Sequence, residues 1–324
     1  MSGPVEVDLL VVGAGPAGLF AAYYAGFRGL SVAVVDSLPE PGGQITAMYP
    51  EKQIFDVAGF PAVRGRDLVA ALVAQAAPYE PRYLLGADAT ELSWVDGAAR
   101  VLVGASPVLA RAVLITAGIG EFSPRPLPAA RDWLGRGVVH FVPELAAHRG
   151  QDVVVVGGGD SAFDWVLALH PLARSITLVH RRARFRAHPG LVREVEALGV
   201  ELVTDAEVAE VRGDANGVRE VELELGGRRR VLPAQTVVAA LGFTADLGPI
   251  RSWGLELEKR SIVVDSTMRT NRERIYAAGD VATYPGKVKL IATGFGEAAT
   301  AVNNIATALD PTAHLFPGHS SDRG

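Results

Sequence analysis

One strand–helix–strand unit occurs twice in this chain, and this repetition constrains the fold more than any other feature of the sequence. In the first copy, the apolar run 5–12 ends at a glycine turn, and helix-forming residues 17–28 and a β-rich run, 30–35, follow it. In the second copy, residues 152–156, the triple glycine 157–159, and residues 161–169 and 175–179 repeat that order. Such units begin parallel sheets. The sequence therefore predicts an α/β protein with two Rossmann-like dinucleotide-binding domains.

The position of the second copy suggests that it is inserted into the domain that the first copy begins. The similar runs 113–118 and 237–242 each end at a glycine, as a strand leaving a domain would. The proline-rich stretch 124–128 is a plausible hinge where the chain passes from the first domain to the second. The chain is expected to cross back to the first domain near residues 242–248. We therefore expect residues 1–117 and 244–324 to form an FAD-binding domain and residues 118–243 to form an NADPH-binding domain. A chain of 324 residues is long enough for two cores.

Charge and hydropathy exclude two broad classes of partner. The net charge is −5 and the pI is about 5.8, so no global basic field favours nucleic acid. The apolar run 9–12 is far too short to span a membrane, and it lacks the flanks of a signal peptide. We expect a cytoplasmic protein that binds neither nucleic acid nor membrane.

The sequence contains no cysteine. This excludes disulfides, thiolate metal ligands, iron–sulfur ligation by cysteine, and any cysteine nucleophile or redox pair. None of the seven histidines lies at metal-site spacing with an acidic partner, so no metal site is expected.

The first glycine turn has the G-x-G-x-x-G spacing of a dinucleotide site, in Gly13, Gly15 and Gly18. Gly13 allows the tight turn, Gly15 lets the backbone approach a pyrophosphate, and Gly18 lets the helix pack close to the sheet. The N-terminus of the helix then offers free N–H groups to the phosphates. Asp36 ends the next strand, where a carboxylate accepts hydrogen bonds from ribose hydroxyls. The alternative, an ordinary tight turn, explains fewer of these features.

The second turn repeats the spacing as Gly157, Gly159 and Ala162, but the charge at the anchor position is reversed. His180 falls where the first unit has Asp36, and Arg181, Arg182, Arg184 and Arg186 follow it. A guanidinium cluster attracts a ribose 2′-phosphate, which an acidic residue would repel. The second site should therefore prefer NADP to NAD, although a basic solvated loop would give the same run of residues.

Opposite anchors call for two different dinucleotides. The basic site takes NADPH, and the acidic site is compatible with FAD or NAD. FAD is the better interpretation, because a flavin accepts a hydride from NADPH whereas two nicotinamides would achieve little.

The order of motifs resembles the thioredoxin reductase-like flavoproteins over nearly the whole chain. The resemblance rests on the first fingerprint and on the runs 41–44 (PGGQ), 157–162 (GGGDSA), 180–182 (HRR) and 278–280 (AGD). The disulfide-bearing members of that family carry Cys-x-x-Cys near the start of the NADPH domain, where this chain reads GVVHFVPE at 137–144. Residues 160–165, 185–188 and 317–321 are similar to the cysteine-free branch, the thioredoxin reductase-like ferredoxin–NADP(+) reductases. The family fold is a homodimer of two-domain protomers.

The resemblance implies further contacts with FAD. Gln44 would contact its flavin side, Tyr49 would stack on one isoalloxazine face, and Asp280 would hydrogen-bond the ribitol. His319 would cover the other face, from either protomer, with Ser321 near the ring. Without the resemblance, Tyr49 also fits an ordinary loop residue, His319 a disordered tail and Asp280 a helix cap. The full set expected at FAD is Gly13, Gly15, Gly18, Asp36, Gln44, Tyr49, Ala89, Phe122, Asp280, His319 and Ser321. The set expected at NADPH is Gly157, Gly159, Ser161, Ala162, His180, Arg181, Arg182 and Arg186.

These expectations amount to a mechanism without a catalytic side chain. NADPH would pass a hydride to flavin N5, and the electrons would leave singly to ferredoxin or flavodoxin. A helix N-terminus, at the stretch 291–296 before a helix over 297–309, would stabilise the charge of the reduced flavin. Because such carriers are acidic, Lys287 and Lys289 are candidates for a basic docking patch, unless they are ordinary loop lysines. Two other functions stay open: reduction of quinones, free flavins or metal chelates by NADPH, and a flavin redox sensor with negligible turnover.

Overall fold

The computed structural model describes residues 4–319, and these form two compact units. The first unit joins the chain up to Glu121 with the chain from Ala245 onward, and the second is Phe122–Thr244. The sequence placed the first crossing slightly earlier, between residues 117 and 118. The turn that follows remains with the first unit, because Gly120 lies against the backbone of Asp246 and has no room for a Cβ atom. The two crossing segments, β9 (Glu121–Pro124) and β18 (Phe243–Asp246), pair as a two-stranded sheet.

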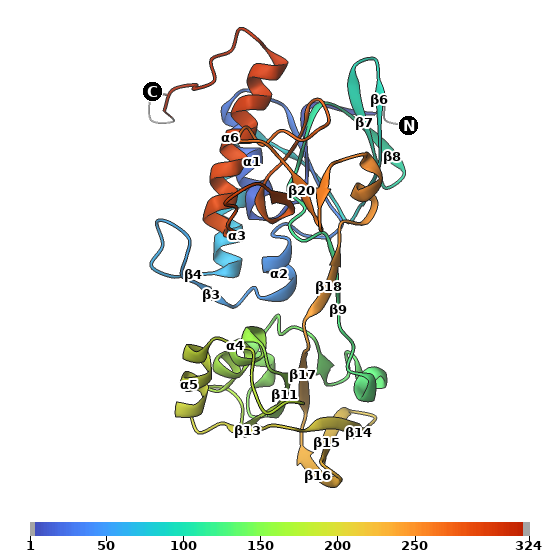
Figure 1. The fold of residues 1–324 in the computed structure, drawn as a ribbon, viewed down its shortest axis with the longest axis vertical. Coiled ribbons are helices and arrows are strands. Elements are labelled where there is room, and N and C mark those ends of the chain that lie inside the picture. The colour runs from blue at the N-terminus through green and yellow to red at the C-terminus, as the bar shows by residue number, and fades with distance from the viewer. Residues whose placement is uncertain (1–3, 320–324) are drawn as a thin grey trace. The chain divides into compact units, whose positions relative to one another are not determined.

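The first unit is built on a seven-stranded sheet (Figure 1). Its centre is the expected unit of β1 (Val5–Val12), α1 (Pro16–Phe27) and β2 (Val32–Asp36), with β1 and β2 parallel. Residues 9–12 and 32–35 are buried on both faces of the sheet, which explains their unbroken apolar runs. The sheet order is β5 (Arg82–Leu85), β2, β1, β8 (Ser106–Ile115), β7 (Ala98–Val103), β6 (Ala89–Val95). β21 (Ile275–Ala277) pairs with β8 after the chain returns from the second unit.

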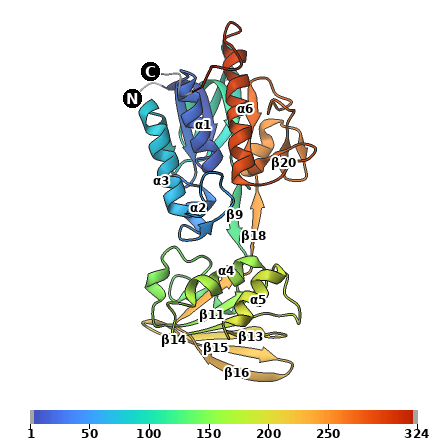
Figure 2. The same ribbon diagram turned by 90° about the vertical axis from the view of Figure 1, so that its left-hand side faces the viewer.

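Three helices of the first unit lie side by side, with α1 between α3 (Gly65–Ala76) and α6 (Ile291–Leu309) (Figure 2). The sequence predicted that α6 would begin at residue 297, and this is wrong: the helix begins at Ile291. Gly294 packs closely in the first turns of this helix, with its ideal Cβ position 3.4 Å from both Ala17 Cβ and Gly279 Cα. The remaining elements of this unit are α2 (Gln44–Met48), β3 (Gln53–Ile54), β4 (Val63–Arg64), η1 (Ala77–Tyr79), η4 (Gly248–Trp253), β19 (Leu257–Glu258), β20 (Ser261–Val263), η5 (Gly279–Val281) and β22 (Ala282–Thr283).

The second unit repeats the design on a five-stranded parallel sheet. The order is β10 (Val138–Val139), β17 (Thr236–Ala240), β11 (Asp152–Gly157), β12 (Ser175–Val179), β13 (Glu201–Val203). The helices are α4 (Asp160–Leu169) and α5 (Pro189–Ala197), with the 3-10 helices η2 (Pro128–Trp133) and η3 (Leu145–His148). The predicted α/β class is confirmed in both units, although the first sheet is mixed, since β6 and β7 join its parallel strands by antiparallel pairing.

A separate antiparallel sheet in the second unit contains the basic run 228–230. The sheet consists of β14 (Glu207–Asp214), β15 (Gly217–Leu225) and β16 (Arg228–Pro233). Arg229 pairs with Glu222 and Glu224, and Arg230 pairs with Glu201. Carboxylates on β15 and β13 therefore partly neutralise Arg229 and Arg230.

No helix in the described part of the chain is long and apolar enough to cross a membrane.

Candidate dinucleotide-binding sites

The first glycine turn, between β1 and α1, leaves no room for side chains at two of its three glycines. A Cβ atom on Gly13, whose φ is +114°, would lie 2.5 Å from the carbonyl oxygen of Thr116. A Cβ on Gly18 would lie 1.9 Å from the carbonyl oxygen of Gly13. The hydroxyl of Thr116 donates to that same oxygen at 2.8 Å. Gly13 and Gly18 therefore let strand, turn and helix approach closely.

Gly15 is different, because space lies in front of it. Its φ is −70°, and a Cβ atom placed there would meet nothing within 4 Å. It is the N-cap residue of α1, and no side chain caps the helix. Free N–H groups and the positive end of a helix dipole thus face open space, which is the environment that a pyrophosphate requires.

Asp36 is held next to this turn by two backbone donors. The N–H of Ala14 donates to Oδ2 at 2.7 Å, and the N–H of Leu38 donates to Oδ1 at 2.9 Å. Burial raises the pKa of Asp36, and the Asp88 carboxylate adds to the increase, although the two N–H donors oppose it. Ala89 follows Asp88 directly at the start of β6. The carboxylate is fixed where it can accept further hydrogen bonds from a ribose.

A second glycine pair lies against the first turn. The N–H of Gly42 donates to the carbonyl oxygen of Ala14 at 2.8 Å, and the ideal Cβ position of Gly43 is 3.1 Å from Gly15 Cα. Gln44 follows and begins α2. Its side-chain nitrogen lies 2.7 Å from the ideal Cβ position of Gly118, so only a glycine leaves room for it there.

Asp280 and Tyr49 complete this cluster. Gly279, whose φ is +78°, brings η5 to the first turn of α1, with its ideal Cβ position 3.2 Å from Ala17 Cβ. Burial raises the pKa of the Tyr49 hydroxyl, and the carboxylates of Asp280 and then Asp56 add to the increase. Tyr49 therefore lies within electrostatic range of Asp280.

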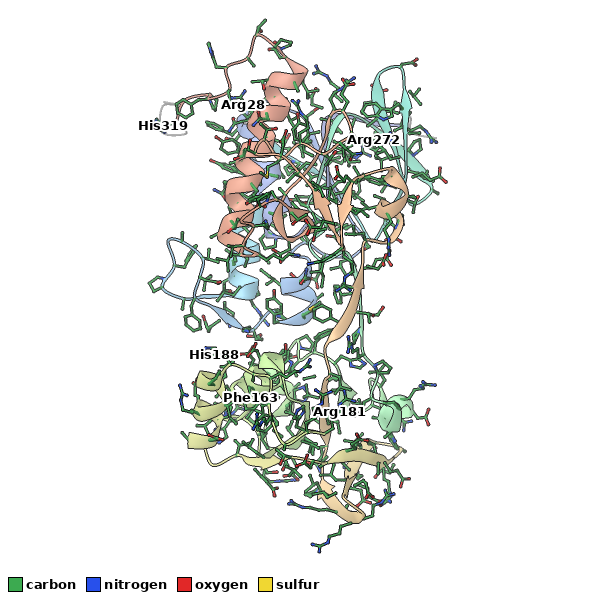
Figure 3. All side chains as sticks on the ribbon, in the orientation of Figure 1. Arg28, Phe163, Arg181, His188, Arg272 and His319 are labelled. Atoms are coloured by element: carbon green, nitrogen blue, oxygen red, sulfur yellow. The ribbon has the colours of Figure 1, made fainter. Side chains whose placement is uncertain are left out.

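Two of the described residues expected at FAD, Phe122 and His319, are not part of this cluster. Phe122 belongs to the second unit, where its ring lies edge-on to Phe141 and Phe243. His319 is exposed beside Phe316, on the side of the first unit where Arg28 lies (Figure 3). Arg28 ends α1 and binds the backbone carbonyls of His314 and Leu315, so the tail is fixed at the opposite end of that helix from Gly15. Ser321 lies outside the described residues.

The glycine turn of the second unit repeats the geometry of the first. A Cβ on Gly157 would lie 2.4 Å from the carbonyl oxygen of Ala240 and 3.0 Å from Ala162 Cβ. A Cβ on Gly159 would meet nothing within 4 Å, and this residue is the N-cap of α4, again without a side-chain cap. Ser161 is exposed on the first turn of α4. The second unit therefore also offers an open helix N-terminus to a pyrophosphate.

His180 lies beneath the second turn and is buried. A Cβ on Gly158 would come within 2.3–2.6 Å of its imidazole ring, which also lies against Phe185. Burial lowers the pKa of His180, and the neighbouring Arg182, Arg186 and Arg181 lower it further. In this geometry His180 packs under the turn, and its direct contact with NADPH stays a prediction.

The arginines after His180 are all exposed (Figure 3 labels Arg181). The loop returns to the glycine turn, because the N–H of Arg186 donates to the carbonyl oxygen of Gly158 at 2.7 Å. The loop end is fixed as well, by a 2.7 Å hydrogen bond from the N–H of His188 to Asp160. Four exposed guanidinium groups therefore sit on a loop tied to the open helix N-terminus of α4.

The structure corrects one expectation and reveals one residue that sequence reasoning missed. Lys287 cannot belong to a docking patch, because its side chain is only 5% exposed and forms an ion pair with Glu297. The sequence predicted Glu297 only as the first residue of a helix, with no role at a site. The signal was available, since Glu297 is the only charged residue in α6. Lys289 is exposed, with its ammonium 3.5 Å from the hydroxyl of Ser261.

Within residues 4–319, no group of three or more His, Asp or Glu side chains is placed to hold a metal ion.

Comparisons with known proteins agree with this geometry. The profile of one family, described as pyridine nucleotide-disulphide oxidoreductase, matches residues 7–304. The chain is 80% identical to a ferredoxin–NADP reductase of Saccharopolyspora erythraea, over 99% of each chain, and 65% identical to one of Salinispora arenicola, over 98% of this chain and 99% of that one. Among solved structures it is similar to the thioredoxin reductase of T. acidophilum, with a TM-score of 0.78 and 25% identity over 95% of this chain and 99% of that one. The thioredoxin reductase of Lactococcus lactis, at 23% identity over 94% of this chain and 99% of that one, has the same fold with a TM-score of 0.77.

Proposed function

Because the chain belongs to the pyridine nucleotide-disulphide oxidoreductase family, we propose that it is an NADPH-dependent FAD enzyme that exchanges electrons with ferredoxin or flavodoxin. The names of its relatives, 80% and 65% identical, support this carrier. The observation that carries the proposal is the pair of open helix N-termini with opposite anchors, in a chain without cysteine. Electrons from the flavin have no thiol to reduce, so they must leave the protein.

We assign FAD to the first unit. The turn at Gly13, Gly15 and Gly18 would receive the pyrophosphate, and Asp36 would accept hydrogen bonds from the adenosine ribose. Gln44, Tyr49 and Asp280 would hold the flavin half. Bound FAD would accept two electrons as a hydride and release them one at a time. The side chains orient the cofactor and exclude water, and none serves as a nucleophile.

We assign NADPH to the second unit. The turn at Gly157 and Gly159 would receive its pyrophosphate, with Ser161 and Ala162 on the first turn of α4. Arg181, Arg182 and Arg186 would bind the 2′-phosphate by charge-assisted hydrogen bonds. The paired crossings β9 and β18 are candidates for the hinge between the two assigned domains.

A homodimer would explain the position of the C-terminal tail. Arg28 fixes the tail at the far end of α1, which at 12 residues is about 18 Å long. His319 would therefore cover the flavin of a partner protomer. Leu315 and Phe316 in the tail are more than half exposed, and burial in a dimer would remove them from water. Sedimentation at micromolar concentration would contradict the homodimer if it shows only monomer.

We place the protein in the cytoplasm, where NADPH and such carriers are found.

The competing functions differ in what reoxidises the enzyme. After reduction by NADPH in a stopped-flow instrument, reoxidation by ferredoxin should be fast, repeat over many turnovers and slow as salt rises, because docking to an acidic carrier is electrostatic. Faster reoxidation by a quinone, free flavin or metal chelate, without salt dependence, would favour the small-molecule reductase. Negligible turnover with every acceptor would favour the redox sensor.

A further inference from the structure

We propose that Glu297 is a positioning residue for FAD, which holds the Gly279–Asp280 turn where Asp280 can reach the cofactor. The inference rests on the proposed function, since it concerns the site assigned to FAD. Glu297 does not touch the cofactor in this proposal. It acts through the backbone of Gly279.

Both oxygens of the Glu297 carboxylate accept hydrogen bonds within the first unit. Oε2 accepts the N–H of Gly279 at 2.7 Å. Oε1 accepts the hydroxyl of Tyr284 at 2.7 Å and also a hydrogen bond from the Lys287 ammonium. One side chain of α6 therefore ties together η5 and the loop that follows β22.

The ion pair is almost completely removed from water. The side chain of Lys287 is 5% exposed and that of Glu297 is 4% exposed. Charges buried in this way are stabilising only when their hydrogen bonds are satisfied, and removing one partner leaves the other uncompensated. The hydrogen bond to Glu297 raises the pKa of Tyr284 to about 12, and burial contributes, so its hydroxyl stays protonated as a donor. Lys287 also lies over the Tyr284 ring, 5.6 Å from its centroid.

The turn that Glu297 holds is packed between two helices. The ideal Cβ position of Gly279 is 3.2 Å from Ala17 Cβ on α1, and that of Gly294 on α6 is 3.4 Å from Gly279 Cα. Gly279 therefore has contacts on both sides, and the Glu297 carboxylate supplies the acceptor for its N–H. Asp280 is the next residue after Gly279. A shift of Gly279 would therefore move the Asp280 carboxylate away from the site that Asp280 shares with Tyr49. The equal and opposite charge of Lys287 lets a carboxylate serve this purpose without adding net charge beside the site.

The test compares two isosteric variants in the same unit. Glu297→Gln removes the charge of the network, and Asp8→Asn is its matched control. Asp8 also accepts an N–H and a hydroxyl, both from Ser31, and pairs with Arg111, but it lies on β1 before the buried strand core and away from the glycine turn. Apoprotein of each variant would be titrated with FAD by flavin fluorescence, with its unfolding temperature recorded in parallel. Glu297→Gln should raise the Kd for FAD by about tenfold or more, and Asp8→Asn should leave the Kd unchanged even if both lower the unfolding temperature equally.

A second variant and a second measurement keep the inference testable if Glu297→Gln does not fold. Lys287→Met removes the positive charge that pairs with the Glu297 carboxylate. This variant should also weaken FAD binding, alter the flavin absorbance band and speed hydrogen exchange in the 278–290 peptide. An unchanged Kd and an unchanged flavin band in whichever variant folds would overturn the inference. Failure of the wild-type protein to bind FAD would instead refute the proposed function.

Discussion

At the scale of single residues, the two sites differ in the charge that follows the second strand of each unit. Asp36 is tied to the turn by the N–H groups of Ala14 and Leu38, whereas His180 is packed under Gly158 with arginines exposed beyond it. Sequence spacing located the glycines and Asp36 because backbone geometry allows few alternatives at those positions. It could not locate the Lys287–Glu297 pair, since burial of a lysine depends on which helix covers it.

Replacing Arg181 and Arg182 with glutamine should change the choice of nicotinamide. Only NADPH carries the 2′-phosphate, and loss of hydrogen bonds between charged groups should raise its KM by about tenfold to a hundredfold, with little change for NADH. Steady-state kinetics with both nucleotides measures this. Arg131→Gln, an exposed arginine on η2, is the control and should behave like the wild type. Equal increases in KM for NADPH and NADH would argue against a 2′-phosphate contact.

At the scale of elements, the structure separates glycines that the fold requires from glycines that a ligand requires. The turn fixes Gly13 and Gly18 by contact with Thr116 and with each other, whereas Gly15 and Gly159 face open space at uncapped helix N-termini. The sequence predicted both strand–helix–strand units, because apolar runs ending at glycines are strong signals. It missed the start of α6, because glycines at 294 and 296 weaken the helical pattern, and the packing of Gly294 against Ala17 and Gly279 exists only in the folded protein.

Gly15→Ala and Gly18→Ala should therefore have different effects. A Cβ at Gly15 meets nothing, so urea unfolding of the FAD-free protein should be close to that of the wild type, while the Kd for FAD rises about tenfold or more because the methyl group occupies the approach of the pyrophosphate. A Cβ at Gly18 would overlap the Gly13 carbonyl, and it should reduce the free energy of unfolding by about 1–3 kcal/mol. If Gly15→Ala binds FAD normally, the open space is not the pyrophosphate site.

At the scale of the whole molecule, the chain contains two similar compact units, the second inserted into the first. The duplication was readable from the sequence, because each unit carries its own glycine turn. The residue at which the chain leaves the first unit could not be read from the sequence. It depends on the contact between Gly120 and Asp246, which lie more than a hundred residues apart in the chain. The absence of cysteine from the sequence separates this chain from the disulfide-reducing members of its family.

We propose that one unit holds FAD and that the other delivers electrons from NADPH to it. The most direct measurement is the visible absorbance spectrum of the purified protein, loaded with FAD and recorded without oxygen before and after one equivalent of NADPH or NADH. We expect a flavin spectrum that NADPH bleaches rapidly and NADH bleaches slowly. A protein that cannot be loaded with FAD, or whose bound flavin NADH reduces faster than NADPH, would contradict it.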